Sequence, residues 1–203
     1  MRYNFLLNTY ETEIIKVLSV WSMFDDVDLH KRPRSDDPRG RNLLEHMVHQ
    51  SFSEDFWFKT MLDIQVTENP LPTQETRIAF MQAYAHNSRL RLAALSEKDE
   101  NWWEGEAAFF DVREARVWIM TRRLTHTAHH RGQQTTLLRM LKHDLHSTYG
   151  PTADTGGLMT HQAPTIYAYS NESVLLEEEQ YARRKTQLPG TGSYPPTERP
   201  EKL

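Results

Sequence analysis

Two histidines, His126 and His130, lie four residues apart in a stretch whose residue pattern predicts a continuous helix. Side chains at this spacing share one helix face and lie about one turn, on the order of 6 Å, apart along the axis. Their imidazoles can therefore converge on one divalent ion, and neutral imidazole suits zinc, nickel, copper and iron. Because two ligands are too few for a tight site, the fold has to bring a second histidine-bearing helix alongside.

The helix face that carries both histidines is predicted to point inward. At offsets of three or four it combines them with other residues, which are Ala115, Ile119, Arg122, Gln133 and Leu137. A buried histidine needs partners for both ring nitrogens, and an ion on one with a hydrogen bond on the other meets this need. The plainer interpretation is that these are surface or satisfied core histidines, as most histidines on long helices are. His129 points elsewhere and is assigned to the surface or to a supporting role.

The run HTAHHRGQ, residues 126–133, resembles the His-x2-His-His-Arg-Gly-Gln signature of the DinB/YfiT-like superfamily. The resemblance covers roughly residues 1–145. It implies an all-α, four-helix bundle with an up-down-down-up arrangement. It also implies a three-histidine metal site inside that bundle, with one ligand on the second helix and two on the last, which are His126 and His130.

The third ligand implied by the resemblance lies in the segment RNLLEHMVHQSFSEDFWF, which offers His46 or His49. An acidic residue and a tryptophan follow the ligand in the family pattern, and Glu54 and Trp57 fit this spacing better from His49. We therefore expect His49, His126 and His130 to bind the ion. His46 stays open as the alternative, because it lies one turn earlier on nearly the same face.

The chemistry follows from the number of ligands. Three neutral histidines leave an open position on the ion, as in catalytic rather than structural zinc sites. Such an ion lowers the pKa of a bound water or activates a thiolate. The resemblance implies thiol-dependent transferases and isomerases that use low-molecular-weight thiols, beside members with no established activity. We expect a zinc-, nickel- or iron-dependent enzyme acting on a small molecule, a thiol S-transferase or a hydrolase. The alternative is a non-catalytic metal-binding or dimerisation bundle with a stress-related role.

Several other residues are candidates for catalysis, each with a structural alternative. They are Glu54, Arg122, Arg131, Gln133 and Tyr149. The structural alternative for Glu54 is the solvent-exposed face of its helix, and for the two arginines it is a structural ion pair. Tyr149 lies in the loop after the last helix and reaches the site only if that loop folds back. Gln133 is expected to hydrogen-bond the distal ring nitrogen of a ligand or a metal-bound water.

The hydrophobic periodicity predicts four helices, at about residues 3–24, 42–63, 76–95 and 111–142. Asn42 and Asp111 are predicted N-caps, Asp111 with Glu114 as a capping-box partner. Residues 25–41 and 64–74 are predicted connections, rich in proline and charge.

Three local features carry further expectations. Phe52 and Phe56 are expected to shield His49 from bulk water. Gly132 lies inside a helix at a cost on the order of 1 kcal/mol, which suggests the close approach of another backbone or a ligand. The apolar connector 96–110 has to pack somewhere, over the end of the bundle, at the wall of the site or in a dimer contact.

The chain is expected to divide into a bundle at residues 1–145, a C-terminal loop and short helix packed on the bundle at 146–186, and a disordered tail at 187–203. The short helix is predicted within 170–185. Most of the prolines and glycines lie in the C-terminal part, as is typical of turns and tails.

Composition narrows the class of protein. The 203 residues suit one domain of ordinary size. The absence of cysteine excludes disulfides and thiolate ligands, so a thiol reaction would need an external thiol. A formal net charge of −4 argues against nucleic-acid binding. No stretch approaches 18 apolar residues, and the N-terminal segment, interrupted by Glu11 and Glu13, does not resemble a signal peptide. We expect a cytoplasmic homodimer with a small-molecule substrate and no membrane or nucleic-acid partner.

Overall fold

Four long helices form the body of the protein in a computed structural model that describes residues 2–195 and 197. They are α1 (Asn4–Met23), α2 (Leu43–Met61), α3 (Arg77–Ser96) and α5 (Arg116–Met140). The predicted helices at 3–24, 42–63 and 76–95 are confirmed within two residues. Local caps explain where two of them begin. The Asn42 side chain accepts from the Glu45 backbone while Glu45 bonds back to the Asn42 backbone, and Thr76 caps α3.

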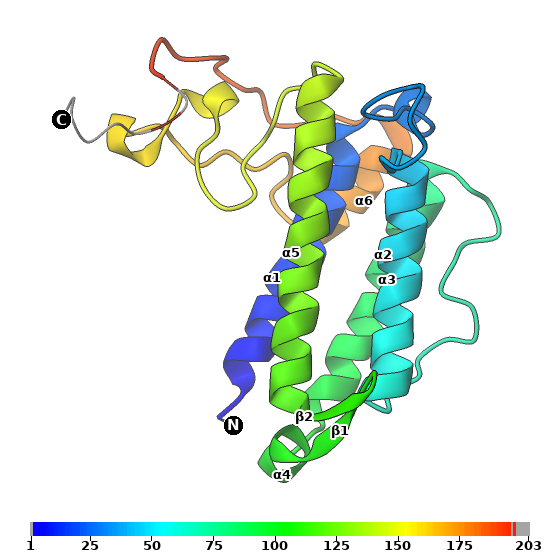
Figure 1. Ribbon diagram of the computed structural model, residues 1–203. Coiled ribbons are helices and arrows are strands. Elements are labelled where there is room, and N and C mark those ends of the chain that lie inside the picture. Colours follow the sequence, from blue (N-terminus) through cyan, green and yellow to red (C-terminus); the bar gives the residue numbers. More distant parts are fainter. Residues whose placement is uncertain (1, 196, 198–203) are drawn as a thin grey trace.

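The helices run up, down, down and up, as predicted (Figure 1). After α2 the chain returns along the outside of the bundle through residues 62–76, so that α3 starts at the same end as α2. α1 packs against α3 and α5, and α2 packs against the same two helices. The resulting order around the bundle places α2 directly beside α5, which brings the two histidine-bearing helices together.

The core of the bundle is aromatic and aliphatic, and its largest apolar side chains are almost completely enclosed. They are Tyr10, Trp21, Phe24, Phe58, Phe80, Tyr84 and Trp103. The Trp21 indole N–H donates to Oε1 of Gln134 at 3.1 Å, so a buried donor on α1 is satisfied by α5. None of the helices in the described part of the chain combines the length and the apolar character needed to cross a membrane.

The connector between α3 and α5 forms structure that the periodicity did not predict. It contains α4 (Glu100–Glu104) and an antiparallel hairpin of β1 (Glu106–Phe109) and β2 (Val112–Ala115) at one end of the bundle (Figure 1). The prediction that Asp111 caps the last helix is therefore wrong. A capping box is a local signal, whereas here the pairing of residues 106–109 with 112–115 and their packing on the bundle determine the outcome.

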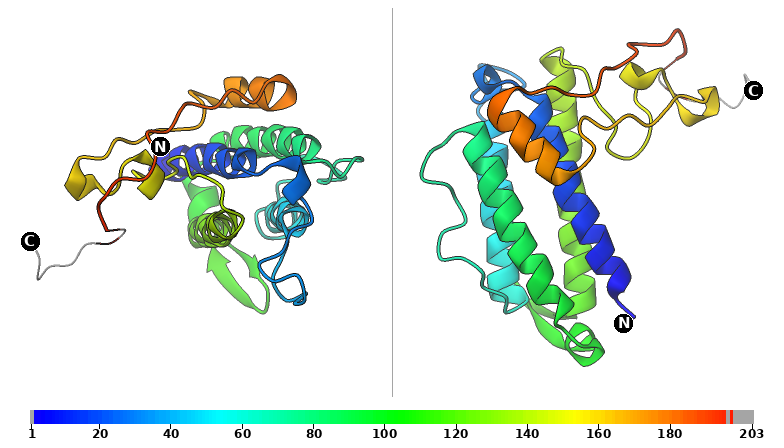
Figure 2. Two further views of the ribbon diagram at one scale, coloured as in Figure 1. Left: turned by 90° about the horizontal axis from the view of Figure 1, so that it is seen from above. Right: turned by 180° about the vertical axis from the view of Figure 1, so that it is seen from behind.

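The C-terminal part wraps around the other end of the bundle. Its helix α6 (Glu172–Tyr181) packs against α1 and α3, on the side away from α2 and α5 (Figure 2). The buried Glu179 on α6 forms an ion pair with the buried Arg77 on α3. Three short 3-10 turns lie in the connections, at Asp26–Asp28, Ala153–Thr155 and Met159–His161. Residues 187–195 and 197 of the predicted tail form no helix or strand, and the rest of that tail lies outside the described residues.

Candidate metal centre

Three histidine side chains meet between α2 and α5. Nε2 of His130 lies 3.0 Å from Nε2 of His49 and 3.0 Å from Nε2 of His126. His126 and His130 come from successive turns of α5, and His49 comes from α2. The two helices pack against each other (Figure 1). Among the described residues these three form a group whose ligand atoms are close enough to hold one metal ion.

The donor atoms of this group fit a divalent ion. Two nitrogens bound to one ion lie about 3 Å apart, because each metal–nitrogen bond is about 2 Å long. The ring planes of the His49–His130 and the His126–His130 pairs are nearly perpendicular, with centroids 4.5 Å apart, and in both pairs the Nε2 atoms are 3.0 Å apart. The set contains three imidazoles and no carboxylate, which suits zinc, nickel or iron.

The rings are uncharged near neutral pH, which is the state that binds metal. Burial lowers the pKa of His126 to about 3 and that of His130 to about 4, and it also lowers the pKa of His49. The positive charge of Arg123 adds to the shift at His126. At His130 the hydrogen bond to Gln133 opposes the effect of burial.

Gln133 hydrogen-bonds the ring nitrogen of His130 that points away from the other two histidines. Its Oε1 lies 2.8 Å from Nδ1 of His130, and its Nε2 lies 3.1 Å from Nε2 of His129. An amide oxygen only accepts, so Nδ1 of His130 carries the proton and Nε2 keeps its lone pair. The structure thus places Gln133 where the sequence analysis expected it, on the distal nitrogen of a proposed ligand, and it gives the exposed His129 a supporting contact.

His126 is held by two neighbours. Its ring stacks on the indole of Trp57 with a centroid distance of 5.7 Å and an interplanar angle of 9°. Nη1 of Arg123 lies 3.2 Å from Nδ1 of His126 and donates to Oγ of Ser53 at 2.7 Å. Trp57 and Ser53 are on α2, so these contacts fix the α5 ring against the neighbouring helix.

The arginine near the ligands is Arg123, not Arg122. Arg123 is buried, whereas Arg122 is exposed and lies over the ring of Trp118 at 5.9 Å. The predicted inward face contained Arg122, which lies four residues before His126. Arg123 lies three residues before His126, and residues at either spacing are neighbours on a helix surface. Arg123 was not among the predicted site residues, and only the direction of packing against α2 distinguishes it from Arg122.

Glu54 lies beneath the site as a buried carboxylate and not on a wet helix face. It accepts hydrogen bonds from Tyr10, Tyr84 and Ser88, and it pairs with Arg91 at 3.3 Å. Arg123 lies 3.7 Å from it and links it to His126. Glu54 therefore supports the site through Arg123, with its oxygens occupied by neighbouring residues.

Arg131 and Tyr149 lie on the other side of α5, against α1. Arg131 forms a buried ion pair with Glu13 and contacts the Tyr149 hydroxyl. Tyr149 also donates to Oε1 of Glu13 at 3.3 Å. Arg131 and Tyr149 are thus part of the contact between α1 and the C-terminal half of α5. The Arg131 side chain points toward α1, whereas that of its sequence neighbour His130 points toward α2.

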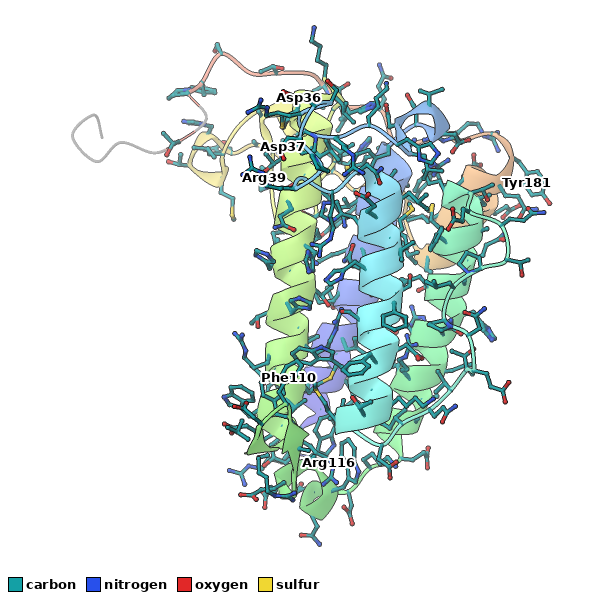
Figure 3. The ribbon with its side chains drawn as sticks, turned by 45° about the vertical axis from the view of Figure 1, so that its right-hand side comes forward. Asp36, Asp37, Arg39, Phe110, Arg116 and Tyr181 are labelled. Carbon is teal, nitrogen blue, oxygen red and sulfur yellow. The ribbon has the colours of Figure 1, made fainter. Side chains whose placement is uncertain are left out.

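The aromatic cover of the site differs from the prediction. Phe52 and Phe56 are exposed, at 55% and 42%, so they do not shield His49. The shield at His126 is Trp57, on which Phe109 and Phe110 of the hairpin pack at centroid distances of 5.2 and 6.2 Å. Figure 3 shows Phe110 in front of the space between α5 and α2.

Gly132 shows no close approach. A Cβ atom at this exposed position would meet no atom within 4 Å, so the interpretation that its cost reflects a tight contact is not supported by the described residues.

A second group of possible ligands, Asp25, Asp28 and His143, lies at the end of the bundle where α1 ends. Nε2 of His143 is 2.6 Å from Asp28, which also binds Lys31 at 2.8 Å, and Asp25 binds Arg183 at 3.0 Å. These carboxylates are already neutralised by neighbouring cations, so the group is explained by ion pairing.

Comparison with known proteins supports the architecture. A crystal structure of a DinB-like protein from Bacillus cereus ATCC 10987 aligns with a TM-score of 0.58 and 20% sequence identity, over 70% of this chain and 92% of that one. The fold is DinB-like. No protein-family model matches the sequence, and no curated protein does either. The DinB-like, all-α bundle expected from the histidine motif is therefore confirmed at the level of the fold.

Proposed function

We propose that this DinB-like protein binds one divalent metal ion through His49, His126 and His130 and uses it in catalysis on a small molecule. The observation that carries the proposal is the convergence of three neutral Nε2 atoms, 3.0 Å apart in two of the pairs. Three ring nitrogens from two helices that converge on one point can bind a single ion there, after the proton that bridges a pair of them in the metal-free protein has been released.

When bound, an ion with three histidine ligands supplies Lewis-acid chemistry, lowering the pKa of a water or of a thiol. The protein's own residues prepare the site. Gln133 keeps the proton of His130 on Nδ1, Trp57 covers one face of the His126 ring, and Arg123 places positive charge beside it. This arrangement suits hydrolysis of a small substrate or transfer of a low-molecular-weight thiol, which has to be external since the chain has no cysteine.

Elemental analysis of untagged protein tests the metal site. We expect about one equivalent of zinc, nickel or iron in the wild type, since three imidazoles hold one ion, and its loss in His126→Ala and His49→Ala. The matched control is His86→Ala, which removes an exposed histidine on α3 and should keep the metal. A wild type that neither contains nor takes up these ions would contradict the proposal.

Turnover tests the catalytic part. Panels of esters, amides and thiol acceptors, the latter with an added thiol, should reveal an activity that the metal-loaded wild type has and His126→Ala lacks. Activity that persists in metal-free His126→Ala would contradict the proposal that the metal ion takes part in catalysis.

A second candidate function is a non-catalytic bundle that forms a homodimer. It is favoured by apolar side chains exposed on the hairpin and the start of α5, which are Phe110, Val112 and Trp118. Light scattering of the eluted protein with and without a chelator decides between the two. A metal-dependent dimer that Phe110→Ser disrupts, together with no activity in the panels, would favour this candidate.

A further inference from the structure

A cavity of about 300 Å³ lies beside the histidines, between the loop that precedes α2 and the last turns of α5. Its lining includes Arg39, Arg41, His46, Gln133, Thr136 and Met140. Figure 3 shows Arg39 in that loop, near the ends of α5 and α2. The cavity is one helical turn from the proposed ligands, since His46 precedes His49 by three residues and Gln133 follows His130 by three.

The charge of the lining is entirely positive. It contains two arginines, and among the described residues no carboxylate lines it. Arg39 is paired with Asp37 at 2.8 Å, and Arg32 of the same loop is paired with Glu45. The ion pairs within the described part of the chain include none with Arg41. Its guanidinium therefore has all of its donors available at the mouth of the cavity.

The buried ring of His46 has no hydrogen-bond partner among the described residues, which is a second observation that points to a ligand. Its side chain is only 4% exposed, it lines the cavity, and its ring makes no hydrogen bond to any described residue. Nδ1 is completely enclosed, so of the two ring nitrogens only Nε2 can donate to a molecule in the cavity. Buried polar groups in folded proteins almost always have a partner, so an unpartnered buried ring in a cavity wall points to a ligand.

Gln133 forms a shared wall between the cavity and the histidine group. It lines the cavity, and its Oε1 accepts the hydrogen bond from Nδ1 of His130. The cavity and the proposed ligand His130 therefore lie on either side of one side chain.

We propose that this cavity binds an oxyanion group of the substrate, a carboxylate or a phosphate, with the Arg41 guanidinium as its main partner and His46 as a further donor. The inference rests on the proposed function, since it names the class of substrate that the same site takes. A guanidinium presents paired N–H donors that match the oxygens of carboxylate and phosphate. An uncharged analogue forms no charge-assisted hydrogen bonds with this guanidinium, so Arg41 would favour the anion over it.

Anion titrations of the metal-loaded full chain test the inference. Inorganic phosphate and acetate are added, with acetamide as the uncharged match for acetate, and binding is followed by the backbone amide signals of residues 40–46 and 133–136. We expect Arg41→Gln to weaken binding of the preferred anion about tenfold or more, as for loss of a charge-assisted hydrogen bond. Arg41→Lys should retain part of the affinity, because lysine keeps the positive charge but lacks the paired N–H donors of the guanidinium.

The matched control is Arg34→Gln. It removes the same charge from the same loop, but Arg34 pairs with Asp36 at 3.0 Å and does not line the cavity. We expect it to change anion affinity by less than about twofold, as for an exposed charge. Equal weakening by Arg34→Gln and Arg41→Gln would show only a general effect of charge and would overturn the proposal, as would acetamide binding as well as acetate.

The His126→Ala variant separates this inference from the proposed function. If it loses the metal but still binds phosphate or acetate in an Arg41-dependent way, the cavity is an oxyanion site of its own. If anion binding disappears with the metal and is indifferent to Arg41, the ion holds the anion and the inference is wrong. If His126→Ala keeps its metal, the proposed metal site fails, while the comparison of Arg41→Gln with Arg34→Gln still decides the oxyanion site.

Discussion

Gln133 illustrates how a single amide can prepare a histidine for an ion. Its oxygen accepts from Nδ1 of His130, so the lone pair stays on the nitrogen that points at His49 and His126. Supporting hydrogen bonds of this kind fix both the ring orientation and the tautomer. The contact is local to α5, because the two residues lie three apart on one helix face.

Gln133→Ala is therefore expected to weaken metal binding by about 10-fold to 100-fold, because loss of the partner that orients a metal ligand typically has this effect. Competition with a chromophoric chelator measures the affinity. The control is Gln82→Ala, on the exposed face of α3, which should leave the affinity unchanged. Equal affinities of Gln133→Ala and wild type would mean that Gln133 does not select the tautomer of His130.

Gly132→Ala is expected to raise the free energy of unfolding by about 0.5–1 kcal/mol, because alanine is the better helix former and a Cβ here meets no atom within 4 Å. Urea denaturation measures the change. A loss of stability, or a loss of metal uptake in this variant, would show that a close approach to Gly132 does matter.

At the scale of elements, a buried carboxylate joins three helices. Glu54 on α2 is bonded to Tyr10 on α1 and to Tyr84 and Ser88 on α3, and Arg91 pairs with it. Burial, and then the charge of Glu54, raise the pKa of Tyr10 and Tyr84 well above the usual range, so both hydroxyls stay protonated as donors. Next to the histidines there is thus a buried polar cluster in which each residue bonds to the carboxylate of Glu54.

Glu54→Leu is expected to lower the free energy of unfolding by about 3–5 kcal/mol, because Arg123 would lose its buried counter-charge, Arg91 would keep only Asp55, and Tyr10 and Tyr84 would lose their acceptor. Glu97→Gln, which removes an exposed charge just after α3, should change it by no more than about 0.5 kcal/mol. Thermal and urea unfolding of both variants provide the comparison. Equal effects of the two substitutions would contradict a structural role for the Glu54 network.

At the scale of the whole molecule, the buried histidines link stability to pH. The folded-state pKa is about 4 for His46 and His130 and about 3 for His126, because burial disfavours the charged ring. In the unfolded chain these rings titrate near pH 6.5. Between these values the unfolded chain binds more protons than the folded one, so protonation favours unfolding as the pH falls.

For metal-free protein we therefore expect the free energy of unfolding to fall as the pH decreases from about 6.5 toward 4, with the histidine contribution fully present only above about 6.5. Urea titrations at a series of pH values test this. Replacing His46 by Asn should make the decline shallower. A wild type whose stability is constant across this range would show that the histidines are charged or exposed in the folded state.

The local signals determined much of this protein. Apolar periodicity predicted three of the long helices closely, and Asn42 was a correct N-cap. The spacing of His126 and His130, with the motif around them, predicted a site that the fold brings together with His49. These features follow from interactions within a few turns of one helix, which a sequence displays directly.

Only the tertiary structure decided the rest, because it depends on which neighbour a side chain meets. Arg122 and Arg123 are equally good helical neighbours of His126, and packing against α2 buries the second. Residues 111–115 were predicted to begin the last helix, yet residues 112–115 pair with 106–109 as a hairpin, which places Phe109 and Phe110 on Trp57. Glu54 resembles a surface carboxylate until tyrosines from two other helices surround it. Contacts between residues far apart in the chain carry this information, and a one-dimensional pattern does not.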